Sequence, residues 1–231
     1  MTGAPCISIV VPALDEAAGI GASLAALQAF RAAGAEVIVV DGASRDATRS
    51  IAAPLADRVI EAPRGRASQM NAGAAVARAD ALLFLHADTT LPAAALQAIA
   101  AALREGHAWG RFDVTIARGG ALLRLVGAMM NARSRLTGIA TGDQAIFVRR
   151  EAFERVGRFP AIALMEDVAL AKKLKRVSRP ACLRERVVTS DRRWRARGTI
   201  RTIVLMWWLR FAYAMGADPG TLARRYDPGR A

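Results

Sequence analysis

The sequence predicts an α/β protein in which helices cover both faces of an open, mainly parallel sheet. Two apolar runs, at 37–40 and 81–85, have the length of buried strands, and each ends in a polar turn with a carboxylate. Helical patterns follow both runs, and strands that alternate with helices pair in parallel through right-handed crossovers. Ligands bind at the carboxyl ends of such strands, where the helices leave the sheet open. Asp41 and Asp88 are therefore expected at the same edge of one sheet.

The β-α pattern fills the first half of the chain and changes after about residue 104. Residues 109–116 alternate in polarity, which predicts a strand with one solvated face. No linker composition or internal repeat divides the 231 residues, so we expect one large domain with a C-terminal helical appendage. Further strands are expected at 7–12, at 58–61 and within 141–148, and helices up to about 33, at 92–104, at 122–130 and from 166.

The chain carries a formal net charge of +13, from 33 basic and 20 acidic residues. A charge of this size favours phosphates, nucleic acid or an anionic membrane surface, without choosing among them. The sequence has no recognition-helix motif, no aromatic strand of the RNA-binding type and no zinc spacing. We therefore expect no specific nucleic-acid partner, and a basic nucleic-acid-binding module is the weakest alternative.

The two cysteines, Cys6 and Cys182, are too few for a disulfide framework and fit the reducing cytoplasm. Residues 1–6 contain no charged leader or long apolar stretch, so we expect no signal peptide. No segment reaches the roughly 20 apolar residues that a membrane-spanning helix needs. The expected location is the cytoplasm.

Charged residues at the predicted turns of the first half allow both a structural and a functional interpretation. Asp88 either caps the helix that begins near Pro92 or binds a ligand at the strand end. Asp15 and Glu16 are either ordinary charges at a helix start or groups that bind sugar hydroxyls.

Two further turns are equally open. Arg64 and Arg66 lie in a glycine-containing loop that enters a helix, which is either a phosphate cradle or a solvated basic turn. Glu166 and Asp167 open a helix, where two carboxylates are commonly just favourable to the helix dipole.

Six motifs appear in a fixed order along the chain: Pro12-Ala13-Leu14-Asp15-Glu16, Asp41-Gly42-Ala43-Ser44, Arg66 to Asn71 with Gly73, Leu83 to Asp88, Gly142-Asp143-Gln144 and Met165-Glu166-Asp167. In this order they resemble a family 2 glycosyltransferase of the GT-A fold. The resemblance implies a GT-A domain at 1–195, with a nucleotide-binding half at about 1–90 and an acceptor half at about 91–195. An amphipathic helical extension would follow at 196–231.

The resemblance also implies a role for each motif. Asp88 matches the last acid of the family's DxD motif and would hold Mg²⁺ or Mn²⁺ on the donor diphosphate, since these ions take hard oxygen ligands. Asp167 matches the general base. The nucleotide sugar would contact Pro12, Ala13, Asp15, Glu16, Asp41, Arg66 and Asp88; the acceptor side would contain Gly142, Asp143, Gln144 and Glu166; and the diphosphate would also meet Arg192, Arg193 and Trp194.

Two positions depart from the family pattern. His86 stands where DxD has its first acid, so the ion would depend more on the donor phosphates. Ser190 stands at the first position of the (Q/R)xxRW motif, of which Arg193 and Trp194 match the end. The strand-ending His-Ala-Asp and the two later turns also resemble a small bacterial subgroup often found beside radical-SAM genes.

These features together predict a metal-dependent, inverting glycosyltransferase that moves a sugar from a nucleotide-diphosphate sugar to a hydroxyl acceptor. UDP is the favoured nucleotide, because the family most often uses it. In this chemistry a positioned base takes the acceptor proton, and a metal with arginines neutralises the departing diphosphate. A nucleotidyltransferase or another nucleotide-sugar enzyme on a similar sheet is the main alternative.

The predicted helix at 200–215 is apolar on two faces. Ile200, Val204, Trp207 and Phe211 share one face, and apolar residues also occupy much of the opposite face. A helix docked on a sheet buries only one stripe, so the second needs the protein core, a second copy of the chain or a membrane. Tryptophans beside Arg192, Arg193, Arg195, Arg197, Arg201, Arg210, Arg224 and Arg225 suit an anionic headgroup layer. We expect peripheral binding to the inner face of the cell membrane, and a lipid-linked or apolar acceptor; a homodimer is the alternative.

Overall fold

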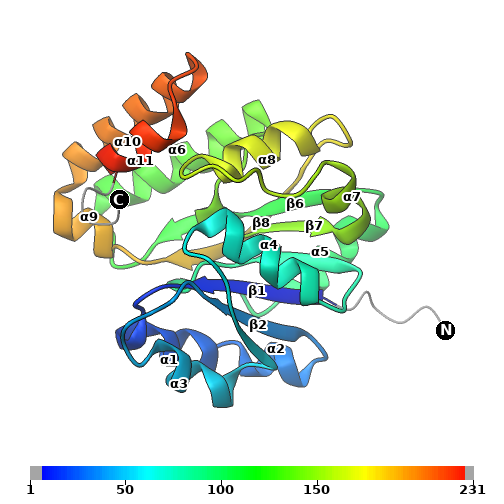
Figure 1. Cartoon of the computed structure of the whole chain (residues 1–231). Coiled ribbons are helices and arrows are strands. Elements are labelled where there is room, and N and C mark those ends of the chain that lie inside the picture. Colours follow the sequence, from blue (N-terminus) through cyan, green and yellow to red (C-terminus); the bar gives the residue numbers. More distant parts are fainter. Residues whose placement is uncertain (1–6, 227–231) are drawn as a thin grey trace.

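One eight-stranded sheet forms the centre of the protein in the computed structural model, which describes residues 7–226 (Figure 1). The strand order is β3-β2-β1-β4-β7-β6-β8-β5, and four of the seven pairings are parallel, which confirms the mainly parallel sheet. Cys6 lies outside the described residues. The strands are β1 (Ile7–Ala13), β2 (Glu36–Asp41), β3 (Arg58–Glu61), β4 (Ala81–Phe84), β5 (Thr89–Thr90), β6 (Trp109–Ile116), β7 (Ile146–Arg149) and β8 (Ala181–Thr189).

Helices cover both faces of the sheet. In Figure 1, α1 to α3 lie below it and α4, α7 and α8 above it, so that each face of the central strands has its own apolar layer. The helices are α1 (Ala17–Ala25), α2 (Gln28–Ala32), α3 (Thr48–Ala52), α4 (Arg66–Val76), α5 (Ala95–Arg104), α6 (Ala121–Thr137), α7 (Arg150–Arg155), α8 (Glu166–Leu174), α9 (Arg192–Arg197), α10 (Thr199–Ala214) and α11 (Pro219–Tyr226).

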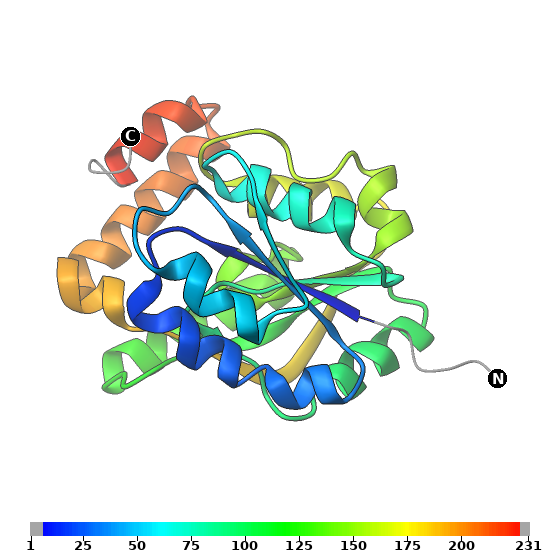
Figure 2. The same ribbon diagram turned by 60° about the horizontal axis from the view of Figure 1, so that its bottom comes forward.

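The central strands β1, β2 and β4 run in parallel, so their carboxyl ends meet at one edge. Ala13 pairs with Asp41 at the end of β1 and β2, and the amide of Leu85 donates to the carbonyl of Val10 just beyond β4. Figure 2 shows α10 and α11 beyond this edge. The predicted meeting of the strand-end turns is therefore observed.

Helix α4 packs unusually close to this sheet, which places its first turn at the strand ends. A Cβ atom at Gly73 would lie only 2.4 Å from the Val10 side chain, so a larger residue does not fit without movement. In the preceding turn, Gln69 donates hydrogen bonds of 2.8 Å to the carbonyls of Ala13 and Val40. These bonds hold β1, β2 and the start of α4 together.

The prediction of one solvated face for β6 is wrong. Arg111 is fully buried, donates to Ser134 of α6 over 3.0 Å and forms an ion pair with Asp113. Asn131 of the same helix exchanges two hydrogen bonds with the backbone of Val114. The cause is that α6 ends at Thr137, beyond the apolar stretch at 122–130, and covers the polar face of the strand.

Helix α10 uses only one of its apolar faces for packing within the chain. Leu209 is fully buried and forms a cluster with Leu222 of α11, with Val168 of α8 and with Leu164 just before that helix. On the other face Ile200, Val204, Trp207, Phe211 and Met215 are exposed, so burial in the core does not explain that face. Within residues 7–226, no helix is both long enough and apolar enough to cross a membrane.

Candidate active site

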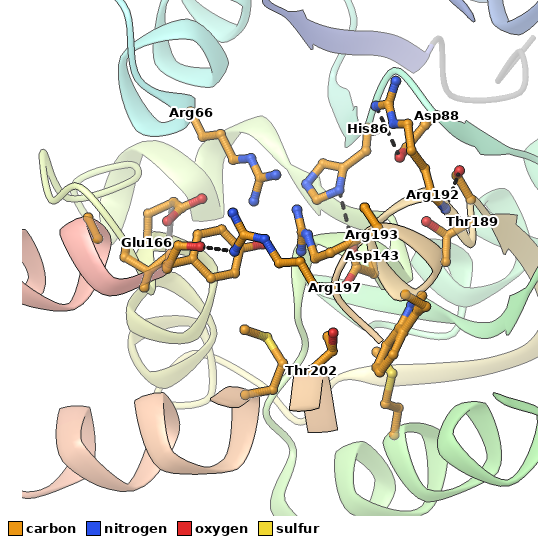
Figure 3. A pocket seen from close by; sticks show the side chains of 18 of the residues that line it. Arg66, His86, Asp88, Asp143, Glu166, Thr189, Arg192, Arg193, Arg197 and Thr202 are labelled. Carbon is orange, nitrogen blue, oxygen red and sulfur yellow. Dashed lines mark hydrogen bonds and ion pairs between the residues drawn. The ribbon is translucent and has the colours of Figure 1, made fainter. Parts of the chain in front are cut away.

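A cavity of about 1000 Å³ lies at the carboxyl edge of the sheet and extends to the C-terminal helices. Eight arginines but only four acidic residues line it, which favours an anionic ligand. Figure 3 shows Arg66, Arg193 and Arg197 pointing into this space. The charged lining residues are Glu16, Arg64, Arg66, Asp88, Arg133, Asp143, Glu166, Arg192, Arg193, Arg197, Arg210 and Arg224.

Asp88 follows β4 and faces the cavity with 36% of its side chain exposed. It does not cap the next helix, because α5 begins at Ala95 without a side-chain cap. Arg192 lies 3.8 Å from the Asp88 carboxylate and donates two hydrogen bonds of 2.9 Å to Glu16. One guanidinium therefore joins the turns after β1 and β4 to the C-terminal segment.

The turn at 142–144 packs directly against the residues that follow β4. Nδ1 of His86 lies 3.3 Å from Oδ1 of Asp143, and a Cβ atom at Gly142 would lie 2.4 Å from Nε2 of the same ring. Only glycine leaves room for the imidazole there. Burial would raise the pKa of Asp143, but the hydrogen bond and charge of His86, with Arg193 and Arg66, hold it well below its usual value. Asp143 is thus ionised at neutral pH.

The same turn also orients Asp167 at the start of α8. The amide of Gly142 donates a 2.7 Å hydrogen bond to Oδ2 of Asp167, and the amide of Val168 donates a 2.6 Å bond to Oδ1. Each carboxylate oxygen keeps a lone pair for a further partner. The carboxylate is therefore fixed in direction but still able to accept a proton.

Glu166, its neighbour in the chain, lines the main cavity and is only 4% exposed (Figure 3). Burial raises the pKa of Glu166 to about 7, and the charge of Asp167 acts in the same direction, against the opposing charge of Arg66. A carboxyl group that titrates near 7 can give or take a proton at neutral pH.

Arg66, in the first turn of α4, lies among several acidic groups of the site. Burial acts to lower its pKa, but the fields of Tyr226, Glu166, Asp143 and Asp167 raise it above its ordinary value. Arg66 is therefore a permanent positive charge, held among the acidic groups of the two later turns.

Four turns around the cavity each contain a non-glycine residue in the left-handed backbone region. Their φ angles are 53° at Asp15, 64° at Ala43, 48° at Ala145 and 69° at Met165. Such a conformation costs about 1 to 3 kcal/mol and persists only where the surroundings fix it. Strain concentrated at these turns is typical of a functional site.

At the ends of β1 and β2 the site has a less charged region. Pro12, Ala13 and Leu14 line the cavity, whereas Asp41 is fully buried outside its lining. Oδ2 of Asp41 accepts a 2.9 Å hydrogen bond from the Ser44 amide, but Oδ1 has no partner among the described residues. A buried unpaired oxygen costs free energy, so this oxygen is suited to a polar ligand.

The family model described as glycosyl transferase family 2 matches residues 8–157. The chain belongs to this family. A comparison with curated proteins gives no match. The family match confirms the resemblance drawn from the ordered motifs. The narrower resemblance to the radical-SAM-associated subgroup stays a prediction.

Solved structures of glycosyltransferases share the fold. The mannosyltransferase PcManGT from Pyrobaculum calidifontis, in complex with GDP-Man and Mn²⁺, has a TM-score of 0.66 and 22% identity and covers 95% of this chain and 67% of that one. TarS 1-349 of S. aureus has a TM-score of 0.63 and 19% identity, with 80% and 60% covered. Glucosyl-3-phosphoglycerate synthase from Mycobacterium tuberculosis, with Mn²⁺ and UDP, has a TM-score of 0.59 and 19% identity, with 80% and 71% covered. The chain therefore matches only about 60% of the length of TarS 1-349.

This family 2 glycosyltransferase gathers most of the residues implied by the resemblance around one cavity. Gly142 and Asp167 instead line a small adjoining pocket with His86 and Glu166. Gln144 is fully buried outside both pockets and bonds to the Thr141 backbone within its own turn. The predicted residues that line the main cavity are Pro12, Ala13, Glu16, Arg66, Asp88, Asp143, Glu166, Arg192, Arg193 and Trp194.

Asp15 holds a turn together and does not line the cavity. Its Oδ1 accepts a 2.8 Å hydrogen bond from the Arg45 amide, and its own amide donates to Ser44. A contact between its carboxylate and a nucleotide sugar therefore stays a prediction.

Sequence reasoning missed part of the basic lining. It placed Arg197, Arg210 and Arg224 at a lipid headgroup layer, but these three arginines line the cavity. It did not single out Arg133 of α6 at all. The sequence did not predict this lining because α9 to α11 fold back over the strand ends, which the local pattern of the sequence does not reveal.

The protein residues fit a metal ion only if the donor brings further ligands. No group of three or more His, Cys, Asp or Glu within residues 7–226 is arranged to hold a metal. Asp88 offers a partly exposed carboxylate, while Nδ1 of His86 is engaged with Asp143. A single carboxylate suits Mg²⁺ or Mn²⁺ that is bound mainly through substrate phosphates and water.

The raised pKa of Glu166 predicts a pH-dependent effect of Glu166→Gln on stability. Because the folded-state pKa of about 7 exceeds the ordinary 4.5, wild type loses stability as pH rises from about 4.5 to 7, and the variant does not. We expect the Tm difference, variant minus wild type, to be at least about 2 °C more positive at pH 8 than at pH 5 in thermal unfolding. The exposed Glu105→Gln is the control; equal differences at both pH values would contradict the prediction.

Proposed function

We propose that this glycosyltransferase moves a sugar from a nucleotide-diphosphate sugar, UDP-linked by preference, to a hydroxyl acceptor with inversion and with a divalent ion. The observation that carries the proposal is a single strand-end carboxylate, Asp88, in a cavity lined by eight arginines. Solved relatives of the same fold support it, since TarS is found in complex with UDP-GlcNAc and PcManGT with GDP-Man and Mn²⁺.

The donor is assigned to the carboxyl ends of β1, β2 and β4. The nucleoside would lie against Pro12 and Ala13, with the unpaired Oδ1 of Asp41 as an acceptor for a base N–H. The diphosphate would meet Arg66 and Arg192, which are poised to neutralise its charge. Arg192 already holds Glu16, so it is oriented before the donor arrives.

Mg²⁺ or Mn²⁺ would be held by Asp88 together with the donor phosphates. Its contribution, when bound, is to stabilise the negative charge that develops on the departing diphosphate. On the acceptor side, Asp167 would take the proton of the attacking hydroxyl, because the amides of Gly142 and Val168 fix its carboxylate. Glu166 is the second candidate for this base, since it lines the cavity and has a pKa near 7.

The role of Asp88 predicts a loss of metal-dependent donor binding in Asp88→Asn. The substitution keeps the shape but removes the charge, so Mn²⁺ should no longer add to the thermal stabilisation given by UDP or GDP. Thermal shift with nucleotide, with and without Mn²⁺ and a chelator, measures this. Asp80→Asn, an exposed change at the start of β4, should behave as wild type. If Mn²⁺ still adds to the stabilisation of Asp88→Asn by nucleotide, Asp88 does not hold the metal ion.

Asp167→Asn tests the base. We expect turnover, followed as nucleoside diphosphate release from a bound nucleotide sugar, to fall about 10²- to 10⁴-fold while donor affinity is kept. Glu166→Gln is the matched comparison. If Glu166 is the base instead, Glu166→Gln carries the larger loss, and wild-type turnover falls below about pH 7 as this carboxyl becomes protonated. Near wild-type turnover in Asp167→Asn would show that Asp167 is not the base and serves only as a favourable charge at the start of α8.

We also propose that the extension at 196–231 lies on an anionic membrane surface at the inner face of the cell membrane. Within the described part of the chain, every exposed large apolar side chain except Val188 lies on α6, on α10 or at Met215, directly after α10. Such a patch is unusual for a monomer in water, and the exposed Arg124 and Arg201 lie beside it in sequence. A lipid-linked or apolar acceptor would reach the cavity from this side.

Cosedimentation with vesicles that contain anionic lipid tests this surface. We expect wild type to pellet at low salt and Val204→Ser/Phe211→Ser to stay in solution, because both residues are exposed and lie outside the cavity lining. Val188→Ser is the control. A wild type that stays in solution while forming dimers through this patch, measured by light scattering, would assign the patch to a second copy instead.

A further inference from the structure

Arg133 of α6 stands out among the basic residues of the cavity because two nitrogens of its guanidinium group are buried without a hydrogen-bond partner. Only three buried side-chain polar atoms in residues 7–226 lack a hydrogen bond, and two of them are Nε and Nη2 of Arg133. Buried unpaired polar groups are rare and costly, and a charged one is the most costly. A group of this kind needs either a structural reason or a ligand.

Arg210 of α10 lines the same cavity. Burial and the charges of Arg210 and Arg111 together lower the pKa of Arg133 to about 10, while the carboxylate of Asp167 opposes them. Arg133 therefore keeps its charge at neutral pH, and two like charges share one wall. Arg210 makes no hydrogen bond or ion pair with any described residue, so its charge is not compensated by a contact.

Three arginines nearer the donor strands differ in this respect, whereas Arg64 and Arg66, just before α4 and in its first turn, likewise make no hydrogen bond or ion pair with a described residue. Arg192 is paired with Glu16, Arg193 lies 4.7 Å from the centre of the Tyr226 ring, and Arg197 donates to the Tyr226 carbonyl. The protein thus occupies these cations with its own groups. On the side of α6 and α10, Arg133 and Arg210 are left for a ligand from outside.

The surroundings of this pair indicate the rest of the ligand. Apolar side chains of the same two helices line the cavity around the pair and continue onto the exposed patch of α6 and α10. These side chains can contact a hydrocarbon part of the ligand, and they add no charge of their own. The lining residues concerned are Leu122, Leu125, Val126, Met129, Ile203 and Trp207.

We propose that Arg133 and Arg210 form an oxyanion subsite for the acceptor, separate from the donor diphosphate site at Asp88 and Arg192. It takes a phosphate or carboxylate group attached to an apolar chain. Asp167 influences Arg133 through its charge, so the bound anion lies on the base's side of the cavity. The description of this ligand as the acceptor rests on the proposed sugar transfer. The binding of the anion to the two arginines does not.

The test uses octyl phosphate as a probe of the subsite, in the full chain saturated with UDP and Mn²⁺. Calorimetric titration should show octyl phosphate bound at least about 10-fold tighter than octanol, because hydrogen bonds to charged groups separate the two. Comparison with octanoate shows whether the subsite prefers a phosphate or a carboxylate group. Comparison with inorganic phosphate shows how much the apolar chain contributes to the affinity. Octyl phosphate that displaces UDP instead of binding beside it would overturn the proposal.

Variants connect the binding to the two arginines. Arg133→Gln and Arg210→Gln should each weaken octyl phosphate about 10- to 100-fold and leave UDP affinity unchanged. Arg104→Gln, an exposed change at the end of α5 outside the cavity lining, is the control and should alter neither. Unchanged octyl phosphate affinity in Arg133→Gln, with UDP binding intact, would remove the subsite and leave the donor assignment standing.

Stability without ligand separates a binding role from a structural one. If Arg133 serves a ligand, replacing the unpaired buried cation removes a desolvation cost, so Arg133→Gln should unfold at the same or a higher Tm than wild type. A lower Tm would show that the guanidinium supports the fold, against the proposal. If wild type binds no UDP, the proposed sugar transfer from a UDP-sugar is contradicted. The same titrations without nucleotide still test the subsite.

Discussion

The cavity depends on the contacts of one residue, Gly142. Its amide holds the Asp167 carboxylate, and its missing side chain admits the His86 ring, which in turn pairs with Asp143. A single peptide therefore joins three segments: the carboxyl end of β4, the turn before β7 and the first turn of α8. The donor-side carboxylate at Asp88 and the acceptor-side carboxylates are positioned relative to each other through this point.

Charge is distributed unevenly over the cavity. On the donor side, Glu16 and Asp88 lie against Arg192, so the protein's own acids partly balance the arginine. Between α6 and α10 no such balance exists for Arg133 and Arg210 among the described residues. An incoming diphosphate must compete with the internal partners of Arg192, whereas an anion at the second place meets Arg133, two of whose nitrogens are already buried without a partner. This difference favours distinct ligands at the two ends of one cavity.

Strand-end positions could be predicted from the sequence because β-α alternation fixes both the direction of the strands and the edge at which they end. Asp88 and Asp41 followed from that rule alone, whereas Asp143 and Asp167 needed the ordered motifs. The polar face of β6 was misjudged because its cover, α6, is built from residues whose apolar pattern stops before the helix does. Arg133 could not be found at all, since its isolation arises from the packing of α10 against distant segments.

The ion pair between Glu16 and Arg192 joins residues that are 176 positions apart in the chain. Closing so long a loop is slow and entropically costly, so a contact of this kind forms late in folding. During synthesis, the strands and turns of the first 190 residues can assemble while Arg192, which completes the proposed donor site, is still unmade. The chain therefore cannot acquire a finished donor pocket before most of it has left the ribosome.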